Sequence, residues 1–318
     1  MKPLSKAALN VEGQPMFKVL DKVERMEREG RKIFHFELGE PTFNTPQNII
    51  NATIDSLQNG DTHYVNSYGK YDLRCVIQDT TLESRGFKPD INQILITPGA
   101  NAIIYLAISC LVNPGEEVII PNPGFPTYFS AAKFVGAKIV SVPLYEENSF
   151  RLNPDDLEKK ITSKTKLIII NSPSNPTGAT MTKEELNAVF KIAEKYDVYI
   201  LSDEIYGRMV FGNFETFFSP GINDNCQKRT IIANGFSKAF AMTGWRIGVA
   251  IGPKEIINKM MLLVQTINSC VPPFIQSGAK EAILGDKEDL ISMLNYYKKN
   301  RDYLIKNLNM ISGIKCTN

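Results

Sequence analysis

The feature that most constrains the fold is a regular alternation of short, nearly continuous apolar runs with longer helical patterns. The expected strands are QILIT, EVIIP, KIVSVPL, KLIIIN, VYILSDE, RTIIANG and RIGVAIG, between residues 93 and 252. Strands that are apolar at nearly every position are buried on both faces, as in a parallel sheet with helices on either side. We therefore predict a three-layer α/β fold with a mostly parallel sheet.

Helical patterns occupy the intervals between these strands and extend beyond them. We expect helices over 15–30, 47–59, 70–85, 102–111, 128–135, 154–160, 183–196, 253–270, 272–284 and 287–308. Thr182 and Glu185 have the spacing of a capping box at the start of helix 183–196. One more short strand is predicted in IFHFELGEP, ahead of a tight turn at Gly39–Pro41.

Composition excludes several functional classes. A net charge of +2 without clustered lysines and arginines argues against a nucleic-acid surface. The five cysteines are scattered and are expected to be reduced, as in a cytoplasmic protein. Only His35 and His63 are available, so a histidine-based metal site is not expected. MKPLSKAALN lacks the apolar core of a signal peptide, and no apolar run approaches the ~20 residues of a membrane span.

The most informative stretch is FSKAFAMTGWRIG, from Phe236 to Gly248. Apolar surroundings lower the pKa of a lysine, and a neutral Lys238 amine would form a Schiff base with a carbonyl. Ser237 and Arg246 could hold a phosphate, the arginine through its bidentate fork. Together these residues suggest a lysine that carries a phosphorylated aldehyde, which is how pyridoxal phosphate is held.

Polar and aromatic residues follow the other predicted strands, where ligands of open α/β sheets bind. Ala100 and Asn101 open a helix whose free N–H groups suit a phosphate. Phe125 could stack on a planar ring, and Asn175 lies in a turn fixed by prolines. Asp203 ends a buried strand, where a pyridinium nitrogen at ~4 Å would attract it by roughly 4 kcal/mol, or about three pKa units. Each residue has an ordinary structural explanation when taken alone, but their occurrence at successive strand ends favours one cofactor site.

The chain resembles the fold-type I pyridoxal-phosphate aminotransferases of class I/II. The resemblance extends from about Gly39 to the C-terminus. It is carried by GEPTFNTP, HYVNSYGKYDLR, TPGANAIIYLA, PGEEVIIPNPGFPTY, NSPSNPTG, SDEIYGRMVF and FSKAFAMTGWRIG, in the family's order and spacing.

The resemblance implies a role for each matching residue. Lys238 would form the internal aldimine and move the substrate proton, and Asp203 would pair with the pyridinium nitrogen. Asn175 and Tyr206 would hydrogen-bond the 3′ oxygen of the cofactor. The ring would stack on Phe125, the phosphate would be bound by Ala100, Asn101, Ser237 and Arg246, and Gly39 would line the substrate pocket. Cis peptide bonds are implied at Asn122–Pro123 and Asn175–Pro176.

The implied reaction is ping-pong transfer of an amino group between an amino acid and a 2-oxo acid. Tyr64 matches the tyrosine that family dimers lend to the neighbouring subunit's phosphate, which implies a homodimer with shared active sites. Asn101 stands where some aspartate-type relatives have a lysine for a side-chain carboxylate, which lowers the expectation of an acidic substrate.

The expected domains are an N-terminal segment (1–40), a large cofactor-binding domain (41–285) and the start of a C-terminal small domain (286–318). Family members bind the substrate α-carboxylate with an arginine of that small domain, and Arg301 does not match it. We therefore expect an incomplete small domain and weak or absent turnover by this chain.

Three alternatives are open to different degrees. A β-eliminating lyase would use the same site residues, so the sequence does not separate it from a transaminase. A non-catalytic pyridoxal-phosphate-binding module, such as a regulator's effector domain, is disfavoured because too few residues precede Gly39 for a winged helix. A nicotinamide-dependent dehydrogenase is disfavoured because no G-x-G-x-x-G follows the first strand.

Overall fold

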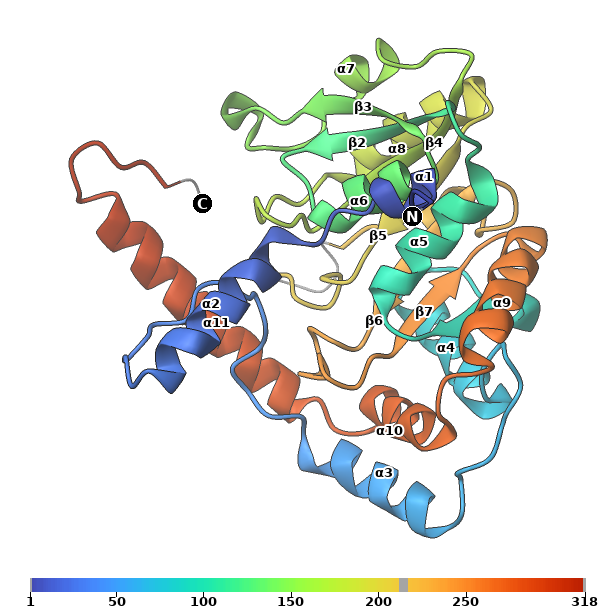
Figure 1. Cartoon of the computed structure of the whole chain (residues 1–318), viewed down its shortest axis with the longest axis vertical. Coiled ribbons are helices and arrows are strands. Elements are labelled where there is room, and N and C mark those ends of the chain that lie inside the picture. Colours follow the sequence, from blue (N-terminus) through green and yellow to red (C-terminus); the bar gives the residue numbers. More distant parts are fainter. Residues whose placement is uncertain (1, 212–216, 317–318) are drawn as a thin grey trace.

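The protein, seen in a computed structural model that describes residues 2–211 and 217–316, is built on one seven-stranded sheet (Figure 1). The strand order is β1-β7-β6-β5-β4-β2-β3. Strands β3, β2, β4, β5 and β6 run parallel, and β7 is antiparallel to both of its neighbours. The strands are β1 (Ile94–Thr97), β2 (Glu117–Asn122), β3 (Lys138–Pro143), β4 (Thr165–Asn171), β5 (Tyr199–Asp203), β6 (Thr230–Gly235) and β7 (Gly248–Ile251).

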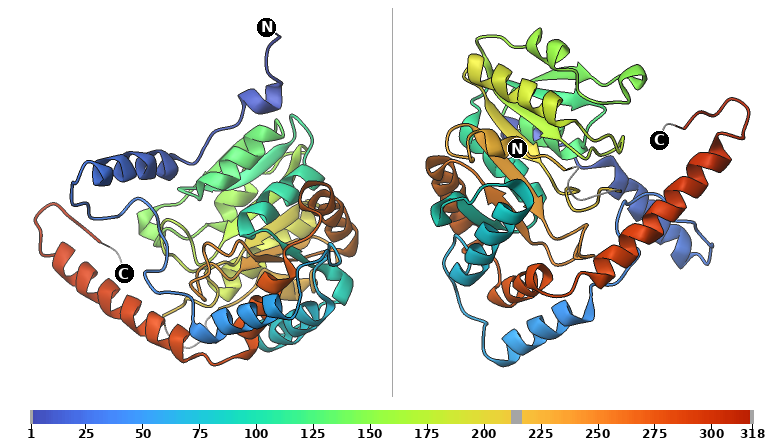
Figure 2. Two further views of the ribbon diagram at one scale, coloured as in Figure 1. Left: turned by 60° about the horizontal axis from the view of Figure 1, so that its bottom comes forward. Right: turned by 180° about the vertical axis from the view of Figure 1, so that it is seen from behind.

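Helices cover both faces of the sheet, so the fold has the three layers that the apolar strands predict (Figures 1 and 2). The longer described helices are α2 (Pro15–Arg28), α3 (Gln47–Gln58), α4 (Tyr71–Arg85), α5 (Ala100–Leu111), α6 (Pro126–Phe134), α8 (Lys183–Lys195), α9 (Lys254–Asn268), α10 (Pro273–Leu284) and α11 (Glu288–Leu308). Short helices α1 (Lys6–Leu9) and α7 (Pro154–Glu158) complete the α-helical set in these residues.

Successive strand residues enter different parts of the core, because side chains alternate between the two faces of a strand. Leu95, Leu167 and Leu201 pack with α5, α6 and α9 on one face. On the other face, Ile94 packs with α4 and α10, and Ile168 packs with α8. These five side chains have no solvent exposure, which explains why strands of this sheet are apolar at nearly every position.

The predicted helices agree with the structure to within a few residues. The capping box is present at α8, where the Thr182 hydroxyl accepts from Glu185 N and the Glu185 carboxylate accepts from Thr182 N. The strand predicted in IFHFELGEP is wrong: residues 31–40, all described by the structure, form none. The alternating Phe34 and Phe36 are 80% and 93% exposed. They have no sheet to pack against, so periodicity alone gave the wrong assignment.

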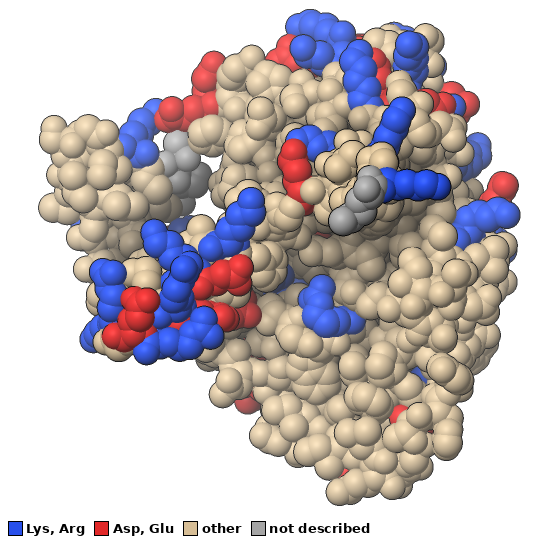
Figure 3. Space-filling view, viewed as in Figure 1, with Lys and Arg blue, Asp and Glu red and all other residues tan. Residues whose placement is uncertain are grey.

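The N-terminal segment lies across α6 and then leads into α2 (Figure 2). The Lys133 ammonium donates to the Glu12 carboxylate at 2.7 Å, and Gln14 Nε2 donates to Thr127 Oγ1 at 2.8 Å. Charged side chains are dense over α2, whereas the lower part of the face in Figure 3, over α3 and α10, carries few. Within 2–211 and 217–316, no helix is long and apolar enough to cross a bilayer.

Candidate active site

A cavity of about 680 Å³ opens where the carboxyl ends of β4, β5 and β6 meet the start of α5. Ten of the eleven predicted site residues line it: Gly39, Ala100, Asn101, Phe125, Asn175, Asp203, Tyr206, Ser237, Lys238 and Arg246. Tyr64 does not line it and is 86% exposed. Arg301 is also elsewhere, with its guanidinium over the Phe211 ring and beside Asp302. Residues from six separate strand ends and loops therefore meet in one cavity.

Asp203, the last residue of β5, presents a buried carboxylate to the cavity. Its side chain accepts from the Tyr128 hydroxyl at 2.6 Å and from Ile205 N at 3.2 Å. Burial raises the pKa of Asp203 to about 6, although these two hydrogen bonds act in the opposite direction. No cation in the described ranges contributes to that pKa. A positively charged ligand group would therefore be favoured beside this carboxylate.

The adjacent acid, Glu204, immediately follows β5 and its side chain makes different contacts. Its carboxylate accepts from Arg85 Nε at 2.7 Å and from the Ser219 hydroxyl at 2.6 Å. Only 1% of Glu204 is exposed. The charge of Glu204 is thus neutralised outside the cavity, and Asp203 is left as the acid that faces the ligand.

Lys238 follows β6 and extends into the same cavity as Asp203. Its Nζ donates to the Gly39 carbonyl at 2.5 Å. Burial lowers the pKa of the Lys238 ammonium; the nearby Glu40 carboxylate raises it, and the positive charge of Arg246 lowers it further. The net direction makes the neutral, nucleophilic amine more accessible than it is for a solvated lysine.

One corner of the cavity is suited to an anion. Gly99 precedes α5, and no side chain of the described residues caps the first N–H groups of that helix. Arg246 reaches this corner with φ at 53°, and a Cβ on Gly99 would lie 2.4 Å from its Nη2 atom. A Cβ on Gly248 would lie 2.8 Å from Ala100 N. The close approach of β7 to α5 therefore requires glycine on both sides of the corner.

Tyr206, Asn175 and Phe125 form the other walls. Burial raises the pKa of the Tyr206 hydroxyl to about 12; the Asp203 charge adds to this, and a hydrogen bond with the Asn175 side chain opposes it. The peptide bonds Asn122–Pro123 and Asn175–Pro176 are cis, as expected from the resemblance, and Ser172–Pro173 is also cis. Phe125 meets the ring of Tyr128 edge-on, with 5.7 Å between centroids.

Sequence reasoning missed several lining residues. Tyr128 lies one helical turn beyond Phe125 and therefore on the same face, which is the signal that could have found it. Asn171 ends β4, and its side chain donates to Asp203 O at 3.1 Å and accepts from Asn175 N at 2.6 Å. The N-terminal Gln14, Met16 and Phe17 also line the cavity. Nothing in their local sequence indicates this position, because it depends on how the segment crosses α6.

Comparisons with known proteins identify the family and several relatives of this chain. The family model for aminotransferase class I and II matches residues 31–318. The chain is 36% identical to an aspartate aminotransferase of Musicola paradisiaca, over 94% of this chain and 75% of the relative. It is 38% identical to aromatic-amino-acid aminotransferase 2 of Thermococcus litoralis, over 87% of this chain and 72% of the relative. The crystal structure of the aspartate aminotransferase of Rhizobium meliloti superposes with a TM-score of 0.93 at 30% identity, covering 100% of this chain and 79% of that one.

The chain therefore belongs to the class I and II aminotransferases. This family depends on pyridoxal phosphate and transfers amino groups between amino acids and 2-oxo acids. The α/β fold and the aminotransferase function expected from the sequence are confirmed by this family membership. The β-eliminating lyase is not favoured.

Proposed function

We propose that this chain binds pyridoxal 5′-phosphate in the 680 Å³ cavity and uses it for transamination, with Lys238 as the amine that carries the cofactor. The observation that carries the proposal is the convergence of Lys238, Asp203 and Arg246 on one cavity from three distant parts of the chain. An amine, an acid and an anion-binding corner are the three features that an aldehyde, a pyridinium nitrogen and a phosphate require.

The residues fit the cofactor for physical reasons. Asp203 is 4% exposed and has no cationic partner in the described ranges, so a pyridinium nitrogen would complement it. The uncapped start of α5, with Arg246 and the Ser237 hydroxyl, would receive the phosphate. Phe125 would lie against the ring, and Asn175 with Tyr206 would hydrogen-bond its phenolic oxygen.

When bound, pyridoxal phosphate supplies an electron-withdrawing ring that stabilises negative charge at the α-carbon of an amino acid. The chain's own residues would then manage protons and charge. The Lys238 amine, with its pKa lowered chiefly by burial, would take the α-proton as a general base. The Asp203 carboxylate would keep the nitrogen opposite it protonated. The Gly39 carbonyl, which accepts from Lys238 Nζ, would mark the side of the cavity at which the substrate enters.

The proposed substrates are an amino acid and a 2-oxo acid, bound in turn at one site. We also propose a cytoplasmic homodimer with shared sites. Two observations support the dimer: Tyr64 is 86% exposed and away from its own cavity, and the face over α3 and α10 carries few charges (Figure 3). Exposed apolar residues that a partner chain could cover are Ile54 and Leu57 on α3 and Ile267 on α9.

The test is spectroscopic and does not require turnover. Purified protein loaded with the cofactor should absorb near the edge of the visible range, and borohydride should abolish this band by fixing the cofactor to Lys238. Lys238→Ala should prevent both the band and the fixation. Fixation at another lysine, shown by peptide mapping, would contradict the assignment. Incubation with an amino acid and 2-oxoglutarate, compared with incubation with cystathionine, separates transamination from β-elimination.

A further inference from the structure

The loop that joins α3 to α4, residues Gly60–Lys70, holds Tyr64 in an unusual position. Tyr64 is 86% exposed and contributes nothing to the cavity of its own chain. A ring of this size in solvent is ordinarily poorly positioned, because nothing restrains its loop. Here the loop is restrained at both ends by hydrogen bonds and an ion pair.

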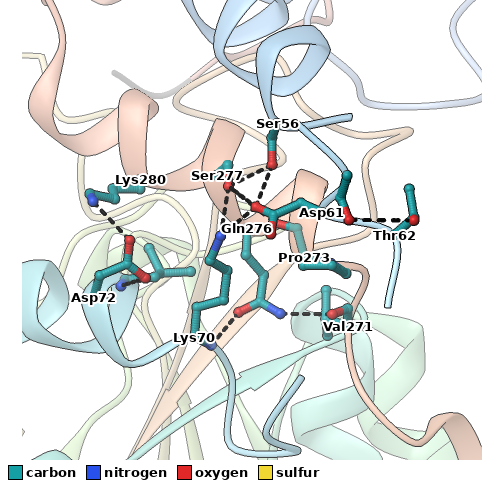
Figure 4. A network of polar contacts seen from close by, with 12 residues as sticks. Ser56, Asp61, Thr62, Lys70, Asp72, Val271, Pro273, Gln276, Ser277 and Lys280 are labelled. Carbon is teal, nitrogen blue, oxygen red and sulfur yellow. Dashed lines mark hydrogen bonds and ion pairs between the residues drawn. The ribbon is translucent and has the colours of Figure 1, made fainter. Parts of the chain in front are cut away.

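Asp61 is the centre of the first restraint (Figure 4). Its Oδ2 accepts from the Ser56 hydroxyl of α3 and from Lys70 Nζ, both at 2.7 Å, and more weakly from the Ser277 hydroxyl of α10 at 3.4 Å. Lys70 Nζ also donates to Ser277 Oγ at 3.1 Å. The hydrogen bond from Lys70 lowers the pKa of the Asp61 carboxyl, followed by that from Ser56. One carboxylate thus joins the two ends of the loop to each other and to two helices.

The second restraint acts on the C-terminal half of the loop. Lys70 N donates to Oε1 of the fully buried Gln276 at 2.7 Å, and Tyr68 O accepts from Ile96 N at 2.9 Å. Gly69 has φ at 103°, and a Cβ there would lie 2.2 Å from Ile96 Cγ1. The chain is therefore fixed to α3 and α10 before Tyr64, and to β1 and α10 after it.

We propose that Asp61 and Lys70 are positioning residues for the cofactor. They restrain the loop in a conformation in which Tyr64 can reach the phosphate-binding corner of a second copy of this chain. This inference rests on the shared-site dimer proposed above. Without this restraint, Tyr64 would have to be ordered when the cofactor binds, and fixing a few residues of backbone weakens binding. Because part of the restraint remains through Gln276, we expect a loss of about five- to tenfold in affinity rather than complete loss.

The experiment is a double-mutant cycle on cofactor affinity, with the whole chain as the sample. The dissociation constant of pyridoxal phosphate is measured by quenching of Trp245, the single tryptophan of the chain. Asp61→Asn should raise this constant about five- to tenfold when Tyr64 is present, and less than twofold in a Tyr64→Phe background. Lys70→Met should behave like Asp61→Asn, and Lys70→Arg should retain most of the affinity.

Lys280→Met is the matched control. It removes an ion pair of similar length, Lys280 to Asp72 at 2.8 Å, in the same region but not in the loop (Figure 4). It should leave cofactor affinity unchanged in both backgrounds. An equal loss from Asp61→Asn with and without Tyr64 would show a purely structural role and would overturn the proposal, as would no loss at all. Tight cofactor binding that Tyr64→Phe does not weaken would overturn both the proposed restraint and the shared site, whereas absent fixation at Lys238 would overturn the proposed function itself.

Discussion

The ends of β4 and β5 and the N-terminal segment line the same cavity, but they are held in contrasting ways. Asp203 is 4% exposed and is fixed by Tyr128, Ile205 and Asn171. The N-terminal segment is attached by side-chain pairs, such as Gln14 with Thr127. From this difference we expect the residues proposed for chemistry to stay in place while the N-terminal segment opens locally at a lower free-energy cost.

His35 is the clearest example of such an attachment. Its two ring nitrogens lie 3.0 Å from a Glu27 oxygen on α2 and 2.8 Å from an oxygen of Glu37, which lines the cavity. Carboxylates only accept hydrogen bonds, so both nitrogens must carry a proton to bond both acids. The link between α2 and the cavity entrance therefore depends on a charged imidazole.

The largest effect on the reaction rate is expected in the rigid region, at Asp203. Asp203→Asn removes the charge opposite the proposed pyridinium nitrogen, an interaction of roughly 4 kcal/mol, and should lower the single-turnover rate of the loaded enzyme about 10³-fold. Glu204→Gln is the control for charge at the neighbouring position and should leave the rate within about tenfold. Comparable losses in the two variants would contradict the division of roles between these acids.

The same substitution should have the opposite sign for stability. With a pKa near 3.8 unfolded and about 6 folded, Asp203 lowers the free energy of unfolding by about 3 kcal/mol at neutral pH. A raised carboxyl pKa means that the folded state holds the extra proton, so stability falls as pH rises from about 4 to 6. Urea unfolding of cofactor-free protein should find Asp203→Asn more stable than wild type at pH 7.5, with a smaller difference at pH 4. The same stability difference at both pH values would contradict a raised pKa for Asp203.

A smaller effect is expected for Tyr128→Phe, which deletes the 2.6 Å hydrogen bond to Asp203. Because both side chains are buried, loss of this donor to the carboxylate should cost about 1–2 kcal/mol. The cofactor dissociation constant should change about tenfold. Tyr105→Phe, a change to a less buried ring outside this cavity, serves as the comparison. Equal affinity of Tyr128→Phe and wild type would show that Asp203 does not need this partner.

The smallest effect belongs to the N-terminal segment. Hydrogen bonds to Glu37 and Glu27 raise the pKa of His35. The link is therefore fully present below the ordinary histidine value of 6.5 and is lost as pH rises through the raised value. Hydrogen exchange in α2 should accelerate over that interval beyond the intrinsic rate. His35→Gln should remove this additional dependence, and its persistence in the variant would exclude His35 as the cause.

The two regions also differ in how well the sequence predicts them. Strand ends are marked by apolar runs followed by polar residues, so Asn175, Asp203 and Lys238 could be placed together from the order of elements. The segment 31–40 alternates like a strand but meets no free sheet edge, so Phe34 and Phe36 remain exposed. The role of Tyr128 could not be predicted, because it depends on a contact with Asp203, 75 positions away in the sequence. The left-handed backbone of Arg246 is not indicated by any local sequence pattern.

The anion-binding corner depends on two absent methyl groups, at Gly99 and Gly248. Alanine at either position would force the guanidinium or the first turn of α5 outward, and the spacing between them would widen. These two glycines therefore set the depth at which a phosphate would sit in the cavity.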